Sequence, residues 1–324
     1  ETMIKRLAIV VPCYNEEEAL PDTDKVLNDL MKDLIKREVV RSNSFILYVN
    51  DGSKDKTWDV IKNAYENSEY VHGLNLAGNK GHQNALLAGL MQVKDEVDVT
   101  ISIDADLQDD VGVIEEMVEK YYSGCDIVYG VRNDRTSDSG FKKFTAETFY
   151  KLMNYMGAKT VYNSADFRLM SNRALDELSL YSETHLFLRG LAPELGFKTD
   201  CVYYKRSPRL KGESKYPLKK MLSFAFNGVT SFSDKPLTLI LYLGFVAILI
   251  AVIAVIYSLV QHASGHTIQG WTSLFASIWF IGGVQLVCLG VIGQYVGKTF
   301  IETKKRPRYY IESYLSHKEK TNEE

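Results

Sequence analysis

Cysteine is scarce in this chain and never occurs in a metal-binding pattern. The four cysteines, Cys13, Cys125, Cys201 and Cys288, form no CxxC pair and show no spacing typical of metal ligands. Scattered cysteines of this kind indicate reduced thiols in a protein that faces the cytosol. We also expect no signal peptide, because the first residues run straight into a strand-like segment.

The chain also lacks an excess of basic residues. Its formal net charge is -3 over 324 residues, so the totals indicate no general affinity for nucleic acid. The hydrophobic share of 46% is ordinary for a globular protein. This length predicts one large domain or two modest ones.

The first part of the chain alternates short apolar runs with helical patterns. The apolar runs predict strands at 7–12, 45–49, 71–76, 99–103 and 126–131. Helical spacing between them predicts helices near 26–35, 84–92 and 113–122, with another after Asp55. The alternation predicts an α/β fold with a mostly parallel sheet covered on both faces. Ligands bind such sheets beyond the carboxyl ends of the strands.

Two carboxylates follow the fourth predicted strand. Asp104 and Asp106 are one residue apart, and alternation along an extended chain predicts that they point to the same side. Mg²⁺ and Mn²⁺ favour carboxylate sites of this kind and share them with substrate phosphates. The alternative is a solvated turn rich in aspartate, since an isolated DxD is a weak signal. Asp109 and Asp110 are near enough in sequence to reach the same cation.

Further polar side chains follow the other predicted strands. Tyr14 could stack on a flat base, and Asp51 could accept a hydrogen bond from a base N–H. Glu16 could hold a ribose hydroxyl, and Lys80 with the backbone around Gly81 could approach phosphates. Each also has an ordinary structural interpretation, such as a ring over the core, a turn residue, an acidic first helical turn or a solvated lysine. Their common place at strand ends favours the functional interpretation.

Several motifs in a fixed order carry a resemblance to a known family. They are the segments 10–17, 50–53, 104–109, 130–135, 165–170, 206–209 and 212–217. With them the chain resembles the family 2 glycosyltransferases of GT-A fold. Within that family it is similar to the polyprenyl-phosphate glycosyltransferases, which include dolichol-phosphate mannose synthase and the bactoprenol glucosyltransferases. One departure is that Asp110 and Val111 stand where the family usually has proline.

The resemblance implies a role for individual residues. Asp104 and Asp106 would serve the metal ion, Mg²⁺ or Mn²⁺, and the diphosphate. Asp166 would lie near the sugar and the acceptor, either as a base or as a group that orients sugar hydroxyls and arginines. The residues expected to bind the nucleotide sugar are Pro12, Tyr14, Glu16, Asp51, Lys80, Asp104 and Gln108.

The nature of the acceptor decides whether a base is needed. An alcohol acceptor needs one, whereas a lipid phosphate, with a second pKa of about 6, is mostly dianionic at neutral pH. Such an acceptor needs cations to capture it, and arginine suits bidentate contact with phosphate. The alternative for these cations is a solvated basic loop or contact with anionic lipid headgroups. The residues expected to bind the acceptor phosphate are Arg132, Arg135, Arg206, Arg209 and Lys215.

Two long uncharged stretches follow, at about 237–260 and 271–296. Each exceeds the ~20 residues that a helix needs to cross a bilayer. Basic residues flank the pair, and 261–270 holds no Lys or Arg, so the positive-inside bias predicts that both outer flanks are cytoplasmic. The predicted organisation is a GT-A domain over 1–212, an amphipathic juxtamembrane segment over 213–235, two spans within 236–298, and a cytoplasmic tail over 299–324. We expect the tail to become polar from Tyr309 onward and to fray.

The sequence thus predicts a metal-dependent, inverting glycosyltransferase of the cell (inner) membrane, with a cytoplasmic catalytic domain and both termini cytoplasmic. It would transfer a hexose, glucose before others, from a UDP-sugar to undecaprenyl phosphate or a related polyprenyl phosphate. The alternatives are N-acetylglucosamine, galactose or GDP-mannose donors, a processive polysaccharide synthase, and a non-enzymatic membrane scaffold. The sequence has no QxxRW motif and too few spans for a processive synthase. A homo-oligomer through the membrane helices is a further expected partner, and nucleic acid is not.

Overall fold

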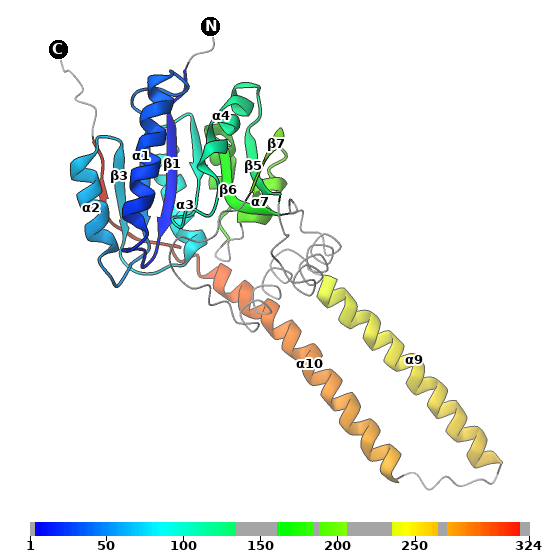
Figure 1. Cartoon of the computed structure of the whole chain (residues 1–324). Coiled ribbons are helices and arrows are strands. Elements are labelled where there is room, and N and C mark those ends of the chain that lie inside the picture. The colour runs from blue at the N-terminus through cyan, green and yellow to red at the C-terminus, as the bar shows by residue number, and fades with distance from the viewer. Residues whose placement is uncertain are drawn as a thin grey trace. The chain divides into compact units, whose positions relative to one another are not determined.

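The computed structural model describes residues 4–133, 161, 163–183, 188–205, 235–264 and 271–317. These residues fall into two compact units. One unit contains the sheet, its helices and the C-terminal strand; the other contains two long helices (Figure 1). The juxtamembrane segment predicted at 213–235 lies outside the described residues except for Lys235.

Eight strands form one sheet in the first unit, in the order β7-β5-β6-β4-β1-β2-β3-β8. Strand β1 is parallel to β2 and β4, and the β2–β3 and β5–β7 pairs are also parallel. Strand β6 runs antiparallel to β4 and β5, and β8 runs antiparallel to β3. The strands are β1 (Leu7–Cys13), β2 (Phe45–Asn50), β3 (Val71–Leu76), β4 (Val99–Ser102), β5 (Ile127–Arg132), β6 (Ser164–Ser171), β7 (Thr199–Tyr204) and β8 (Ile311–Leu315). The predicted α/β fold with a mostly parallel sheet is confirmed.

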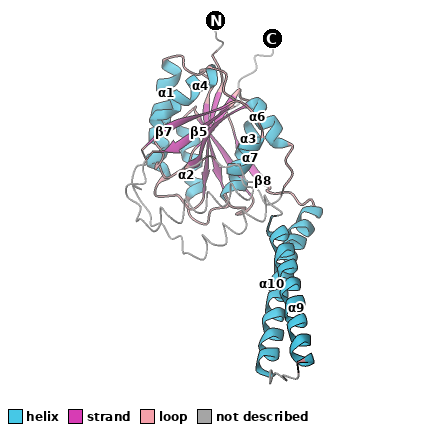
Figure 2. Cartoon of the chain, turned by 90° about the vertical axis from the view of Figure 1, so that its right-hand side faces the viewer, coloured by secondary structure: helices cyan, strands magenta, loops and turns pink. Residues whose placement is uncertain are grey.

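Helices cover both faces of the sheet (Figure 2). Helices α1 and α4 cover one face, and α3, α6 and α7 cover the other. Side chains alternate along the strands, so Val10 and Val49 face α3, where Gly89 gives them room. The helices are α1 (Leu20–Lys36), α2 (Thr57–Asn67), α3 (His82–Val93), α4 (Ile114–Tyr122), α6 (Asn172–Ser179) and α7 (Leu188–Glu194).

The strand order reverses at β1. The chain passes from β1 to β2 and β3 on one side, and returns to β4 on the other side of β1. Such a switch point leaves a crevice between the loops that follow the two neighbouring strands, and ligands bind there. The loops that carry Tyr14, Asp51 and Asp104 all leave the carboxyl ends of these parallel strands.

The C-terminal segment differs from expectation. Residues from Tyr309 onward were expected to fray, but Ile311–Leu315 forms strand β8 on β3, so this expectation is wrong. Tyrosine and isoleucine favour strands, and β3 would otherwise expose an unpaired edge. The segment therefore belongs to the same compact unit as the sheet.

The second unit is a pair of helices, α9 (Lys235–Ala263) and α10 (Trp271–Thr303), which lie side by side (Figure 1). They contain the two uncharged stretches that the sequence marks as spans. Over the described residues, one segment is long and apolar enough to cross a membrane, Phe280–Thr303. A second span is therefore not shown, and it remains a prediction.

The packing of β8 on β3 predicts a pH dependence of stability. His72 of β3 is buried, and its ring stacks on that of Phe45 with 4.0 Å between the ring centroids. It is hydrogen-bonded to the hydroxyl of Tyr314 and accepts the backbone N–H of His317. Burial lowers the pKa of His72 to about 4, and the charges of His317 and Arg6 act in the same direction. Since the unfolded chain binds this proton near pH 6.5, stability should be lost progressively as the pH falls from 6.5 towards 4.

The measurement is the melting temperature of the purified protein at pH 7.5 and pH 5.0. His72→Phe keeps a ring against Phe45 and removes the titration, so it should lose less stability over this pH interval than the wild type. An equal loss in both proteins would contradict the assignment.

Candidate functional site

The loops after β1 and β2 are fastened to each other. The backbone N–H of Asn15 donates to Ser53 Oγ at 3.0 Å, and that of Lys54 donates to Asn15 Oδ1 at 2.9 Å. The N–H of Glu16 donates to Thr57 Oγ1 at 2.9 Å. This bracing holds the segment that begins with Tyr14, whose side chain is 42% exposed. An exposed ring on a rigid loop can offer a flat surface to a base.

Asp51 organises the next pair of loops. Its two carboxylate oxygens accept the N–H groups of Lys80 at 2.7 Å and Gly81 at 2.9 Å. Burial raises the pKa of Asp51, and these two hydrogen bonds oppose that effect. The adjoining Gly52 has a φ of 59°, and a Cβ there would lie 2.4 Å from the backbone of Asn79. The turn after β2 thus lies directly against the loop after β3, as only glycine permits.

The carboxylates after β4 lie in a turn and not on a strand. Strand β4 ends at Ser102, so alternation cannot be applied to Asp104 and Asp106. Asp106 instead accepts the N–H of Gln108 at 3.2 Å, and Leu107 has a φ of 50°. The charge of Asp106 nevertheless contributes to raising the pKa of Asp104.

Asp104 has the character of a cation ligand. Burial raises its pKa most, and the negative charges of Asp166, Asp109 and Asp106 add to this effect. Among the described residues, no group donates a hydrogen bond to its buried Oδ1, although His82 Nε2 lies 3.5 Å away. A buried carboxylate oxygen without a donor, surrounded by other carboxylates, fits a divalent cation. No cluster of three or more His, Cys, Asp or Glu in the described part of the chain is arranged as a complete metal site, so substrate oxygens would have to complete the coordination.

Asp166 is a buried carboxylate whose oxygens are both occupied. Its Oδ1 accepts from Arg168 at 2.9 Å and from Arg189 Nε at 3.1 Å. Its Oδ2 accepts from Arg189 Nη2 at 3.0 Å and from Gln83 at 3.1 Å. Burial by itself would raise the pKa of Asp166, but Arg189, His82 and Arg168 hold it well below its usual range. Such a group is a weak proton acceptor.

His82 lies between the carboxylates of Asp104 and Asp166. Its Nε2 lies 3.5 Å from Asp104 Oδ1 and 3.4 Å from Asp166 Oδ2. Burial alone would lower the pKa of His82, yet these two carboxylates raise it above its ordinary value. When protonated, His82 separates two negative charges that would otherwise repel each other.

Arg132 is already paired. Its guanidinium bonds to Asp109 Oδ1 at 2.9 Å, and Tyr204 donates to the same oxygen at 2.6 Å. Gly130 makes room for this arrangement, because a Cβ there would lie 2.7 Å from the ring of Phe167, which packs against Tyr204. Any contact of Arg132 with an acceptor phosphate would share the guanidinium with Asp109. The role of Arg132 stays a prediction.

The other predicted residues are placed as follows. Pro12 and Gln108 are buried, and Lys80 is exposed on the loop held by Asp51. Asp110 is exposed and accepts the N–H of Gly112, so it caps the turn that follows. The residues Arg135, Arg206, Arg209 and Lys215 lie outside the described residues.

Sequence reasoning missed the partners of Asp166. His82 and Gln83 open α3, Arg168 lies on β6, and Arg189 lies on α7. A histidine or arginine at such positions has no local signature, since its role depends on what the fold brings beside it. The one available signal was the alternation of Asp166 and Arg168, two residues apart in an otherwise apolar segment.

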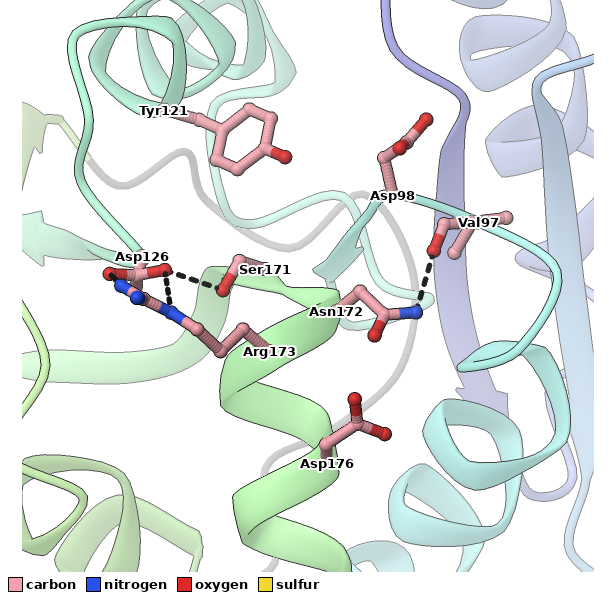
Figure 3. A pocket seen from close by; sticks show the side chains of 8 residues that line it. All are labelled: Val97, Asp98, Tyr121, Asp126, Ser171, Asn172, Arg173 and Asp176. Carbon is pink, nitrogen blue, oxygen red and sulfur yellow. Dashed lines mark hydrogen bonds and ion pairs between the residues drawn. The ribbon is translucent and has the colours of Figure 1, made fainter.

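A separate polar cavity lies at the end of the sheet opposite to the candidate site (Figure 3). It has a volume of about 410 Å³ and lies beside the amino ends of β4 and β5. Its polar groups largely pair with each other or with neighbouring groups, as Asp126 does with Ser171 and Arg173, and Asp176 with Lys94. The lining residues are Val97, Asp98, Tyr121, Asp126, Ser171, Asn172, Arg173 and Asp176. This cavity is distinct from the cluster at the carboxyl ends.

The strand-end carboxylates and the switch-point sheet define the class of the protein. The family described as Glycosyl transferase family 2 matches residues 8–179, which is more than half of the chain. The chain therefore belongs to the family 2 glycosyltransferases, and the match runs from the second residue of β1 to beyond β6, with Asp51, Asp104 and Asp166 inside it.

Close relatives extend this similarity over nearly the full length. The chain is 52% identical over 306 residues to an uncharacterized glycosyltransferase, YkoT, of Bacillus subtilis, covering 94% of this chain and 91% of the relative. It is 40% identical over 311 residues to a prophage bactoprenol glucosyl transferase homolog of Escherichia coli, covering 94% and 98%. Among solved structures, the glucosyl-3-phosphoglycerate synthase of Mycobacterium tuberculosis matches with a TM-score of 0.47 and 14% identity, covering 70% of this chain and 79% of that one.

The buried pair of Asp166 and Arg168 allows a test of the site's construction. Asp166→Asn should destabilise the protein by about 3–5 kcal/mol, because it leaves Arg168, which is 3% exposed, without its counter-charge. The double variant Asp166→Asn/Arg168→Met should recover part of that stability. Thermal unfolding of the three proteins in detergent measures both effects. Equal stability of Asp166→Asn and wild type would contradict the ion pair.

Proposed function

We propose that this chain is a membrane-bound inverting glycosyltransferase that moves glucose from UDP-glucose to undecaprenyl phosphate at the cytoplasmic membrane face. The observation that carries the proposal is near full-length similarity, at about 40% identity, to a bactoprenol glucosyl transferase homolog, combined with carboxylates at the strand ends. The name of that relative implies bactoprenol phosphate as the lipid acceptor. The relatives' similarity extends through the apolar helices as well as the family 2 domain.

The donor would bind at the carboxyl ends of β1, β2 and β4. Tyr14 offers an exposed ring for the base, and Asp51 holds the loop that presents Lys80 to the phosphates. Asp104 and Asp106 would hold the divalent cation, which as a Lewis acid would neutralise charge on the departing diphosphate. Asp104 suits this task because its buried Oδ1 lacks a hydrogen-bond donor among the described residues.

The state of Asp166 supports an acceptor that needs no base. Arg168, Arg189 and Gln83 occupy both of its oxygens and keep it ionised. A lipid phosphate brings its own negative charge, since its second pKa is about 6. Asp166 then acts as a group that orients Arg189 and His82 toward the site, and the attack on the anomeric carbon inverts its configuration.

The helices α9 and α10 would anchor the enzyme in the membrane. Large apolar side chains such as Leu241, Phe245 and Leu286 are exposed along them. Exposed apolar surface of this extent is typical of a segment that contacts lipid. The basic residues on both outer flanks support a cytoplasmic catalytic domain.

A donor screen tests the reaction. Purified full-length protein should form lipid-linked sugar from undecaprenyl phosphate with UDP-glucose, and less or none with UDP-N-acetylglucosamine, UDP-galactose or GDP-mannose. Product is measured by thin-layer chromatography or mass spectrometry of the lipid fraction. Absence of lipid-linked sugar from every UDP-sugar would overturn the proposal, and a preference for another sugar would correct the donor.

The cation is tested by a matched pair of aspartates. Asp106→Asn should lower the transfer rate by about a hundredfold, because it removes electrostatic support for the leaving group. Asp110→Asn is the control: its side chain is exposed and an amide oxygen can still accept the N–H of Gly112, so its rate should stay near that of wild type. A chelator should abolish transfer and added Mg²⁺ or Mn²⁺ should restore it; a rate indifferent to chelation would refute the metal dependence.

A further inference from the structure

Strand β8 brings a C-terminal segment to the carboxyl end of β3. Because β8 is antiparallel to β3, its first residue, Ile311, pairs with Leu76, the last residue of β3. The preceding residue, Tyr310, accepts the N–H of Ala77 at 3.0 Å. Tyr310 therefore lies beside the start of the loop after β3, whose residues Lys80 and Gly81 are hydrogen-bonded to Asp51.

The ring of Tyr310 contacts that loop directly. Lys80 Nζ lies 5.8 Å from the ring centroid, within the range of a cation–π interaction. The backbone N–H of Lys80 is fixed at the same time by Asp51. The lysine is thus held at both ends, by the carboxylate of Asp51 just after β2 and by an aromatic ring from the C-terminal segment.

Glu312 reaches the same region through a hydrogen-bond chain. Its carboxylate accepts from Asn75 Nδ2 at 2.7 Å, and Asn75 Oδ1 accepts from Asn50 Nδ2 at 2.7 Å. Asn50 Oδ1 in turn accepts the N–H of Ser53 at 3.3 Å. Asn50 and Asn75 are buried, so breaking the chain would leave buried amide groups without partners.

Ser53 connects this chain to the loop of the proposed base-binding ring. Its Oγ accepts the N–H of Asn15, which follows Tyr14. The chain from Glu312 therefore ends on the loops after both β1 and β2. Residues 310–312 lie outside the family 2 match, which ends at residue 179, so the family domain alone does not supply these contacts.

We propose that Tyr310 and Glu312 are positioning residues of the donor site. Tyr310 holds the ammonium of Lys80 for the diphosphate, and Glu312 fixes the turn 50–53 through Asn75 and Asn50. This inference rests on the proposed function, because it assigns the two residues to the binding of a nucleoside diphosphate sugar. It predicts that the segment after α10 tunes donor affinity without touching the acceptor.

The test measures UDP binding by calorimetry and steady-state transfer on full-length protein. Glu312→Ala and Tyr310→Ala should each raise the UDP dissociation constant and the donor KM about fivefold, the size expected for a lost interaction of about 1 kcal/mol. The kcat and the acceptor KM should stay near wild type. Glu312→Gln keeps an acceptor oxygen for Asn75 and should recover most of the affinity.

Tyr314→Phe is the control for general loosening of β8, because Tyr314 lies on the same strand and contacts His72 instead of the donor loops. It should leave the donor KM unchanged. The inference is overturned if Glu312→Ala and Tyr310→Ala bind UDP like wild type, or if Tyr314→Phe raises the donor KM as much as they do. Failure of the wild type itself to bind UDP or GDP would instead refute the proposed function, and with it this inference.

Discussion

The buried charge of Asp166 is the constraint on which the rest of the site depends. An ionised carboxylate in the interior is tolerated only when cations and hydrogen-bond donors surround it. Arg168 meets that requirement from β6, the strand of Asp166 itself, and Arg189 and Gln83 meet it from α7 and α3. The need to satisfy one carboxylate therefore fixes the relation of three elements, and it places His82 beside Asp104.

The surroundings of two carboxylates in this site shift their pKa values in opposite directions. Asp166 is saturated with donors, which keep its pKa low. Burial raises the pKa of Asp104, and the charges of Asp166, Asp109 and Asp106 add to this effect while His82 opposes it. A carboxylate whose two oxygens already accept several hydrogen bonds suits orientation, whereas Asp104, whose Oδ1 accepts no hydrogen bond among the described residues, suits a cation. Such a separation of environments is how a site assigns different roles to the same residue type.

Features that depend on a local pattern of residues could be predicted from the sequence. The first five strands were predicted nearly to the residue, because buried parallel strands are continuous apolar runs between turns. The position of Asp51 and Asp104 at strand ends followed from the same pattern. Strand β6 was missed because Asp166 and Arg168 interrupt its apolar character, and their mutual pairing exists only in the folded chain.

Features that depend on distant contacts could not be predicted. Arg132 is paired with Asp109 through a contact that no sequence spacing reveals. The alternation argument for Asp104 and Asp106 failed because the chain turns after Ser102, two residues before the first carboxylate. Strand β8 escaped because its partner, β3, is more than two hundred residues away in sequence.

The C-terminal strand also changes how the donor site should be understood. Without β8, strand β3 would be an edge strand with unpaired backbone groups, and any strand-forming segment could pair with it. The segment that does so here carries Tyr310 and Glu312 to the loops held by Asp51 and Ser53. Residues 304–310 join that segment to α10, so the same stretch of chain that follows an apolar helix also braces the loops proposed to bind the nucleotide. The hydrogen bonds that dock β8 on β3 therefore also hold the loops that are proposed to bind the donor.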